Sequence, residues 1–399
     1  MKLSEKLAAI QPSLTLGLSA KAKALQAKGV DVINFGAGEP DFDTPDNIKA
    51  VAKTELDKGF TKYTATTGII ELKQAVCDKF HRENGLEYKP ENIIISCGAK
   101  HSLYNTIMAI TNPGDEVILP GPYWVSYYEQ ILLAGGKPVI ANTDETTGFK
   151  LTPDLLKKYL SPKTVGLILT SPSNPTGAMY TMDELKVIAD IVLSHPNAMV
   201  ISDEIYEKIF YGDFKPVSIA SLSPEIQNRT IIINGVSKTY SMTGWRIGYL
   251  ASTDTVLIKT IGNFQDHVTS NPVSFAQKAA VAALNSDLAV VNAMVSEFKT
   301  RRDYIVAELN KIPGVKCFLP QGAFYAFPNI AGVLTKKYNG SGIQSSLVLS
   351  ELLLQHAKLA VVPGIAFGAN NYLRFSYATS MKNIVEGIKR FAEFVNKLV

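Results

Sequence analysis

The stretch VGLILTS (165–171), followed by Met182–Leu193 and then by MVISD (199–203), decides the fold because it alternates between two periods. The two short runs are rich in Val, Ile and Leu without polar alternation, which is typical of strands buried on both faces. The segment between them spaces its apolar residues as a helix does. A strand, a helix and a second strand in this order predict a parallel pair covered by helices.

The same pattern extends in both directions along the chain. Strand-like runs also occur at NIIIS (92–96), EVILP (116–120), KPVIAN (137–142), TIIIN (230–234) and IGYLAS (247–252). Helical spacing is found at Ser102–Ile110 and again at Phe275–Leu284. We therefore expect an α/β fold with a mostly parallel central sheet that is flanked by helices. In such sheets ligands bind at the carboxyl ends of the strands, and polar loops follow nearly every run here.

The C-terminal part of the chain has a different order of elements. A long helix at Val291–Leu309 is followed by short strands at VKCFL (315–319), AFYAF (323–327), LAVVP (359–363) and LRFSY (373–377), with helices at 344–357 and 381–398. This α+β pattern predicts a second, smaller domain. We expect a helix near 17–28 to pack with it. The large domain then covers 46–290, and a discontinuous small domain comprises 1–45 and 291–399.

Composition excludes several classes of function. The chain has 399 residues and a formal net charge of +4, from 40 Lys and Arg against 36 Asp and Glu, and its scattered basic residues argue against a nucleic-acid partner. Cys77, Cys97 and Cys317 show no metal-ligand spacing, so we expect no metal site. The N-terminal MKLSEKLAAI lacks the apolar core of a secretory signal, and no apolar run approaches the roughly 20 residues that cross a bilayer. We expect a cytoplasmic protein with no membrane partner.

Two basic residues follow the run TIIIN within NGVSKTYSMTGWRIGY (234–249). An isolated Lys at such a place is ordinarily a surface residue. In a partly apolar cleft, however, Lys238 loses proton affinity and can act as a nucleophile or form a Schiff base. Arg246 offers a planar fork that suits a phosphate.

Polar residues that follow two other strands also have two interpretations each. Asp203 and Tyr206 in SDEIYEKIF (202–210) fit a helix cap and a packed ring. The alternative is an acid that faces a pyridinium nitrogen and a hydroxyl that meets a phenolate oxygen. Asn174 in SPSNPTG (171–177) is by itself an ordinary turn residue.

The last two candidates are an aromatic residue and a cation. Trp124 in GPYWVSY (121–127) fits the core or a ring-stacking platform at a strand end. Arg374 in YLRFSYATS (372–380) lies within a short strand, where it needs either a structural salt bridge or a substrate carboxylate. Each candidate alone has an ordinary explanation, but all of them together, in this order, are a specific signal.

Motifs along the whole chain carry a resemblance to a known family. They are GAGEPDFDTP (36–45), KYTATTG (62–68), GPYWVSY, SPSNPTG, SDEIYE, SKTYSMTGWRIGY, VVPGIAFG (361–368) and LRFSYATS. With these motifs the chain resembles the class I aminotransferases of fold type I, which depend on pyridoxal 5′-phosphate (PLP), and in particular the bacterial and archaeal aspartate aminotransferases of subgroup Ib. The resemblance implies the PLP-transferase fold and a homodimer.

The resemblance also implies roles around the ring of the cofactor. Lys238 would hold PLP as an internal aldimine and later shuttle the 1,3-proton. Asp203 would keep the pyridine nitrogen protonated, so that the ring acts as an electron sink. Tyr206 and Asn174 would bind the ring oxygen, and Trp124 would stack on the ring.

Other matched residues would bind the cofactor phosphate. Arg246 would grip it, and the turn of Gly98, Ala99 and Lys100 at the start of a helix would donate backbone N–H groups to it. Ser237 would supply a hydroxyl, because the chain has glycine three residues before Lys238, where some relatives place a phosphate-binding serine.

The resemblance implies a substrate site and a contribution from a second subunit. Arg374 would clamp the substrate α-carboxylate in a pocket lined by Gly38, Trp124 and Asn174. Tyr63 resembles the tyrosine that reaches the phosphate of the neighbouring subunit.

A dicarboxylic substrate needs a second cation. Lys100 is the candidate for its distal carboxylate, although a Lys at this position can also serve the phosphate. We therefore predict transfer of the amino group of L-aspartate to 2-oxoglutarate, forming oxaloacetate and L-glutamate, by a ping-pong mechanism.

Other functions remain open at this point. A related class I enzyme could prefer aromatic, methionine, alanine or prephenate-type substrates, or the chain could be a PLP carbon–sulfur lyase. Gln11 stands where prephenate-accepting relatives tend to carry a basic residue before Pro-Ser, which argues against prephenate. A nicotinamide dehydrogenase is disfavoured because GAGEPDF (36–42) does not match G-x-G-x-x-G. A cofactor-binding regulator would need a DNA-binding segment, for which the residues before GAGEP leave little room.

Overall fold

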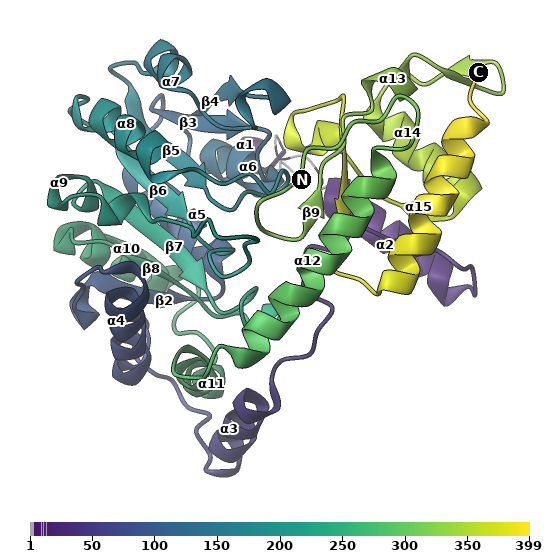
Figure 1. Ribbon diagram of the computed structural model, residues 1–399. Coiled ribbons are helices and arrows are strands. Elements are labelled where there is room, and N and C mark those ends of the chain that lie inside the picture. Colours follow the sequence, from purple (N-terminus) through teal and green to yellow (C-terminus); the bar gives the residue numbers. More distant parts are fainter. Residues whose placement is uncertain (1–3, 9, 11, 13) are drawn as a thin grey trace.

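The computed structural model describes residues 4–8, 10, 12 and 14–399, and its larger part is built on a seven-stranded sheet (Figure 1). The strand order is β2-β8-β7-β6-β5-β3-β4. The strands are β2 (Ile93–Ser96), β3 (Glu116–Gly121), β4 (Lys137–Asn142), β5 (Thr164–Thr170), β6 (Met199–Asp203), β7 (Thr230–Gly235) and β8 (Gly248–Ala251). β8 runs antiparallel to β2 and β7, and the remaining neighbours pair in parallel. The predicted mostly parallel α/β sheet is confirmed.

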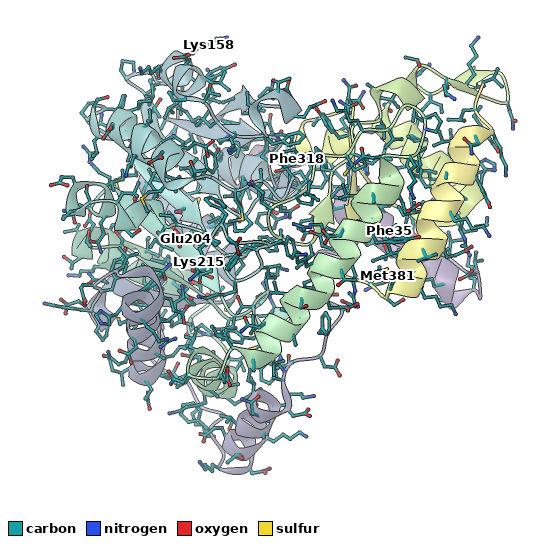
Figure 2. All side chains as sticks on the ribbon, viewed as in Figure 1. Phe35, Lys158, Glu204, Lys215, Phe318 and Met381 are labelled. Carbon is teal, nitrogen blue, oxygen red and sulfur yellow. The ribbon has the colours of Figure 1, made fainter. Side chains whose placement is uncertain are left out.

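Helices cover both faces of this sheet, which explains why its strands are apolar at nearly every position. One face is covered by α5 (Ala99–Ile110), α6 (Val125–Leu133) and α10 (Thr255–Val268), and the other by α4 (Ile70–Asn84), α7 (Pro153–Tyr159), α8 (Met182–Leu193) and α9 (Pro224–Gln227). Along β2, Ile94 packs with the first set, while Ile93 and Ile95 pack on the opposite side. Figure 2 shows side chains filling both layers, with the buried Glu204 inside the larger part.

Most of the remaining elements form the smaller part and the connections to it. The helices are α1 (Glu5–Ala8), α2 (Leu14–Ala27), α3 (Asp46–Asp57), α11 (Ser274–Leu284), α12 (Ala289–Leu309), α13 (Ala331–Leu334), α14 (Ser346–Leu352) with a π-helical turn at Leu353–Ala357, and α15 (Met381–Asn396). The exceptions are α1, which contacts α6, and α3 and α11, which pack together beside α4. The short strands are β1 (Ile33–Asn34), β9 (Tyr325–Ala326), β10 (Lys337–Tyr338), β11 (Ser341–Gly342), β12 (Leu359–Ala360), β13 (Val362–Pro363) and β14 (Leu373–Ser376). β1 pairs in parallel with β12, and α2 lies with the C-terminal elements in Figure 1. α2 and β1 therefore pack with elements from the C-terminal part of the chain.

The prediction of a strand at 315–319 is wrong, because the side chain of Asn310 forms hydrogen bonds with its backbone. Lys316 forms a single antiparallel bridge with Asn329. At the next residue, the Asn310 side chain accepts from Cys317 N at 2.8 Å and donates to Cys317 O at 3.1 Å. Pro320 has no N–H to continue a ladder. The apolar side chains are those of a strand, but the backbone is tied to the end of α12 instead.

In the part of the chain that the structure describes, no single helix is long and apolar enough to cross a membrane. α11 and α12 reach that length and composition only together, as a pair bent by 81°. No group of three or more His, Cys, Asp or Glu residues there is arranged to hold a metal ion.

Candidate active site

The loops after the parallel strands open into a cavity of about 470 Å³. Its lining includes Gly38, Ala99, Lys100, Trp124, Asn174, Asp203, Tyr206, Ser237, Lys238, Arg246 and Arg374. The sheet brings most of them together because the carboxyl ends of parallel strands share one edge. Gly38 comes instead from the segment after β1, and Arg374 from β14. Of the predicted site residues, Gly98 adjoins the cavity through Arg246, and Tyr63 does not line it.

Lys238 lies two residues beyond the buried Val236, at the end of β7. Its Nζ donates a hydrogen bond of 2.6 Å to the carbonyl oxygen of Gly38. Burial lowers the pKa of Lys238 to about 8; Glu39 opposes this shift, and the Arg246 and Arg374 guanidinium groups add to it. The amine is therefore far easier to deprotonate than an ordinary Lys, as nucleophilic chemistry requires.

Asp203 is the last residue of β6 and is 4% exposed. The Tyr127 hydroxyl donates to its Oδ2 at 2.6 Å, and Ile205 N donates to its Oδ1 at 3.2 Å. Burial raises the pKa of Asp203 to about 6, against the opposing effect of the Tyr127 hydrogen bond. Near neutral pH the group is a buried carboxylate that a cationic ring nitrogen would stabilise.

Two backbone segments, at Cys97 and at Thr243, meet around the Arg246 guanidinium to form an anion-binding corner. Gly98 has φ +89°, which favours glycine, and a Cβ added to it would force that guanidinium to move. Arg246 donates from Nη1 to Thr243 O at 2.7 Å and from Nη2 to Cys97 O at 3.3 Å. The N-terminus of α5 begins beside it at Ala99. Guanidinium and helix N–H groups together fit a phosphate.

Arg374 on β14 is 3% exposed, and its contacts are with neutral groups. Nη1 donates to Asn174 Oδ1 at 2.9 Å and Nη2 to Gly36 O at 3.0 Å. Its guanidinium carbon lies 4.4 Å from the ring centroid of Tyr325 and 5.1 Å from that of Phe367. Nε has no hydrogen-bond partner, and among the residues that the structure describes no carboxylate forms an ion pair with it. Such a buried cation calls for an anionic ligand.

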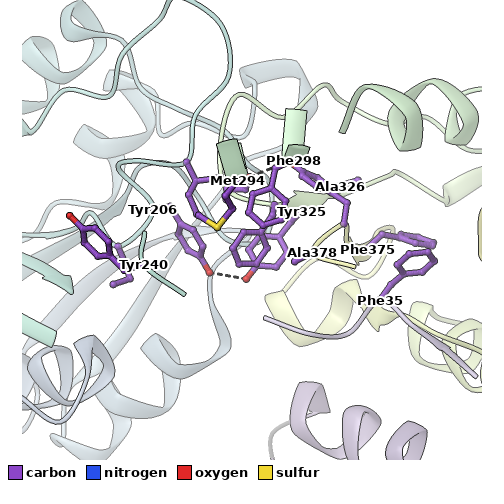
Figure 3. Packing of buried hydrophobic residues seen from close by; sticks show 14 of the residues in the cluster. Phe35, Tyr206, Tyr240, Met294, Phe298, Tyr325, Ala326, Phe375 and Ala378 are labelled. Atoms are coloured by element: carbon purple, nitrogen blue, oxygen red, sulfur yellow. Dashed lines mark hydrogen bonds between the residues drawn. The ribbon is translucent and has the colours of Figure 1, made fainter. Parts of the chain in front are cut away.

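Tyr206 bonds to a residue that the sequence analysis missed. Its hydroxyl lies 2.7 Å from the hydroxyl of Tyr325, as the dashed line in Figure 3 shows. Tyr325 also lines the cavity. It belongs to AFYAF, which the pattern marks only as a strand. Tyr127 was missed in the same way, although it is the last residue of the motif GPYWVSY.

A side chain on the glycine three residues before Lys238 would be tightly packed. A Cβ on Gly235 would lie 3.0 Å from both Gly248 Cα and Ile247 O. Ser237 is 6% exposed and lines the cavity. This arrangement is compatible with the prediction that Ser237 supplies the hydroxyl.

Lys100 and Tyr63 occupy contrasting places. Lys100 Nζ lies 4.8 Å from the ring centroid of Trp124, inside the cavity, and burial lowers its pKa, with Arg246 adding to the effect. Tyr63 is 91% exposed on a loop outside it. Gln11, on which the prediction about prephenate depends, lies outside the described residues.

Comparisons with known proteins point to one family. Residues 30–391 match the family described as aminotransferase class I and II. The chain is 47% identical over 393 residues to the aspartate/prephenate aminotransferase of Cereibacter sphaeroides, covering 98% of each chain. It is 47% identical over 397 residues to the aspartate aminotransferase of Bacillus subtilis, covering 100% of each.

Solved structures give the same result for the fold. The crystal structure of the aspartate aminotransferase from Rhizobium meliloti matches with a TM-score of 0.96 and 42% identity over 100% of both chains. The Thermus thermophilus aspartate aminotransferase with maleate matches with a TM-score of 0.92 and 37% identity, covering 98% of this chain and 99% of that one. Similarity of this extent, over the full length of sequence and fold, shows that the chain belongs to the class I and II aminotransferases and is a PLP-dependent aminotransferase of fold type I.

Proposed function

We propose that the chain transfers the amino group of L-aspartate to 2-oxoglutarate by a ping-pong mechanism, forming oxaloacetate and L-glutamate. The observation that carries this proposal is the buried Arg374, which has neutral hydrogen-bond partners and shares its cavity with Lys238. An amino acid offers a carboxylate to such a guanidinium and an amine to the region of the lysine. Relatives named aspartate aminotransferase in Bacillus subtilis and Geobacillus stearothermophilus, each 47% identical, support a dicarboxylic substrate.

The residues around Lys238 fit the ring of PLP. When bound, PLP supplies an electron sink that stabilises negative charge at the substrate α-carbon. We assign the covalent attachment to Lys238 Nζ and the contact with the pyridine nitrogen to Asp203. Asn174 and Tyr206 would bind the ring oxygen, and Trp124 would pack on the ring.

The corner around Arg246 fits the phosphate of PLP. Arg246 would donate from its guanidinium, and Ser237 from its hydroxyl. Ala99 and Lys100 would donate backbone N–H groups at the start of α5, where the helix dipole favours an anion. Gly98 differs from the prediction, because its N–H already donates to Ser96 O at 2.7 Å.

Lys238 Nζ is also the group that we assign to move a proton from and to the substrate. A pKa of about 8 leaves a useful fraction of the amine neutral near physiological pH, so that it can both accept and return a proton. The hydrogen bond from Nζ to Gly38 O at 2.6 Å orients the amine toward the cavity.

We expect covalent uptake of PLP by the cofactor-free chain to accelerate with pH through a midpoint near 8. Only the neutral amine attacks a carbonyl carbon, and the pKa of Lys238 is lowered from 10.5 to about 8. Stopped-flow absorbance from about pH 6 to about pH 10 measures the rate. A midpoint close to that of an ordinary Lys would contradict the expectation.

We assign the substrate α-carboxylate to Arg374, between Gly38 and Trp124, and the distal carboxylate to Lys100. We expect Lys100→Ala to lower kcat/KM for L-aspartate about 10- to 100-fold, because one charge-assisted hydrogen bond is lost. L-Alanine lacks a distal carboxylate and is the control, for which kcat/KM should change by less than about threefold. If kcat/KM falls equally for both substrates and PLP binds more weakly, Lys100 serves the phosphate instead.

The first half-reaction tests the proposed donor directly. The absorbance of the PLP-loaded protein is recorded before and after L-aspartate alone is added. We expect the cofactor band to convert to that of the pyridoxamine form and to return when 2-oxoglutarate is added. A band that ignores aspartate would leave the family intact and overturn the proposed substrate.

Prephenate is a second candidate because curated relatives carry that name. The aspartate/prephenate aminotransferases of Cereibacter sphaeroides and Nitrosomonas europaea are 47% and 44% identical to the chain. Prephenate is also a dicarboxylate, so the same two cations would serve it. The test adds prephenate as amino acceptor to protein that L-aspartate has converted to the pyridoxamine form. Return of the original cofactor band would show that prephenate is accepted. A panel of aromatic amino acids, methionine and alanine tests the remaining donors, and release of ammonia would reveal a lyase.

We also propose a cytoplasmic homodimer in which Tyr63 reaches the partner's site. Its 91% exposure and its absence from the cavity lining of its own chain support a contact beyond that chain. We propose a large domain over 46–290 and a small domain made of 1–45 and 291–399. The pairing of β1 with β12 supports this division.

A further inference from the structure

The loop that carries Tyr63, here residues 61–69, is held by two glutamines that are each 0% exposed. Gln265 lies on α10 and Gln277 on α11. Neither lines the cavity, and the sequence motifs gave no reason to select them. An uncharged amide buried this deeply must have its hydrogen bonds satisfied, so its partners reveal what it does.

Gln277 fixes two points of the Tyr63 loop to α11. Its Oε1 accepts from Ile69 N at 2.9 Å. Its Nε2 donates to Thr64 Oγ1 at 3.1 Å and to Pro272 O at 2.9 Å. The residue after Tyr63 and the last residue of the loop are thus fixed to α11 by one side chain.

Gln265 holds the middle of the same loop and also the end of β2. Its Nε2 donates to Thr66 O at 2.9 Å and to Ile95 O at 2.8 Å. Its Oε1 accepts from Ser96 Oγ at 2.9 Å and from Asn105 Nδ2 at 3.0 Å. Because β2 leads directly into the turn at Gly98, this amide joins the loop to the phosphate-binding corner of its own chain.

The backbone adds to this rigidity. Ile95 N donates to Thr67 O at 3.0 Å, and Gly68 has φ +102° and no room for a Cβ against Ile95. The loop is therefore fixed on the side that faces its own chain, while Tyr63 extends from it into solvent. Ordering a loop in advance spares that entropy when a contact is made.

We propose that Gln277 and Gln265 are positioning residues that act across the subunit boundary, by holding Tyr63 in place for the partner's cofactor site. This inference rests on the proposed homodimer. Gln277 contacts the loop and its neighbour at Pro272, so it affects the partner's site alone. Gln265 also holds β2, so it affects both its own site and that of the partner.

Hybrid dimers with a single working site test this assignment. Two chains with different affinity tags are co-expressed and purified in tandem, and one of them carries Lys238→Ala. Gln277→Leu is placed either on that inactive chain or on the chain that keeps Lys238. The readout is the PLP concentration that half-saturates the working site, measured after borohydride reduction, which fixes the cofactor only where Lys238 is present. Aminotransferase kcat/KM is the second readout.

We expect Gln277→Leu on the inactive chain to weaken PLP binding at the working site about 10-fold, because a misplaced Tyr63 comes from that chain. On the working chain the same substitution should change it less than about twofold. Gln265→Leu should weaken binding in both arrangements. A Gln277→Leu effect that is equal in the two arrangements, or confined to the working chain, overturns the proposal.

Three further variants keep the test decisive. Thr64→Val removes the hydroxyl that accepts a hydrogen bond from Gln277 Nε2, at a half-buried position. It should give a smaller effect than Gln277→Leu, with the same dependence on which chain carries it. It therefore replaces Gln277→Leu in the test if that variant fails to fold. Gln321→Leu is the matched control, because the Oε1 of Gln321 accepts from Met179 N at 3.1 Å, away from the loop. It should show no effect from the inactive chain.

Tyr63→Phe separates the positioning role of the glutamines from the proposed homodimer. If it acts from the inactive chain and Gln277→Leu does not, the positioning role is wrong and the homodimer stands; if it acts in neither arrangement, both are wrong.

Discussion

Replacement of Lys238 by Ala is expected to lower turnover by several orders of magnitude while leaving PLP bound without a covalent link. The substitution removes the amine that we assign both to hold the cofactor and to move the substrate proton. Lys100 lies elsewhere in the cavity, with its Nζ over the Trp124 ring, whereas Lys238 Nζ is directed at Gly38 O by a 2.6 Å hydrogen bond.

Single-turnover absorbance and steady-state rates measure this loss. Lys100→Ala is the matched control, because it removes a second lysine from the same cavity and should retain much of its turnover with L-alanine. Near-normal activity of the Lys238→Ala protein with any amino donor would overturn the mechanism.

Replacement of Arg374 by Ala is expected to lower kcat/KM for L-aspartate by about 2–5 kcal/mol, or roughly 30- to 5,000-fold. Arg374 is 3% exposed, its Nε has no hydrogen-bond partner among the described residues, and its other partners are neutral. Its charge is therefore available for a bidentate contact with a carboxylate. Arg374→Lys keeps the charge but loses the fork, so it should recover only part of the loss.

A buried arginine outside the cavity provides the control. Arg302 is 8% exposed and already bonds to Asp303 and to Pro320 O. Arg302→Ala should lower thermal stability and change KM for L-aspartate by less than about threefold. If Arg374→Ala behaves in the same way, Arg374 is a structural residue and the substrate carboxylate binds elsewhere.

Much of the fold could be predicted because the central sheet is covered on both faces. Its strands are apolar at successive positions, and the helices between them keep their own period. The miss at 315–319 has a local cause, since Asn310 bonds to the backbone of Cys317. No pattern of apolar residues shows which backbone groups a side chain will occupy.

Part of the candidate site could likewise be predicted from the sequence, and part could not. Asp203, Lys238 and Arg374 were selected from their motifs, and the cavity gathers all three. Tyr127 and Tyr325 contact Asp203 and Tyr206 respectively, but tyrosines in apolar segments are usually core residues. Their roles depend on pairs of hydroxyl and carboxylate oxygens that only the folded chain brings together.

The pairing of β1 with β12 has a consequence for how the chain is made. It places Ile33 beside Leu359, whereas the strands of the seven-stranded sheet all lie between Ile93 and Ala251. On the ribosome that sheet can assemble while the partner of β1 has not yet been synthesised. The segment of α2 and β1 emerges well before β12, so its apolar residues stay exposed until the C-terminal elements have followed.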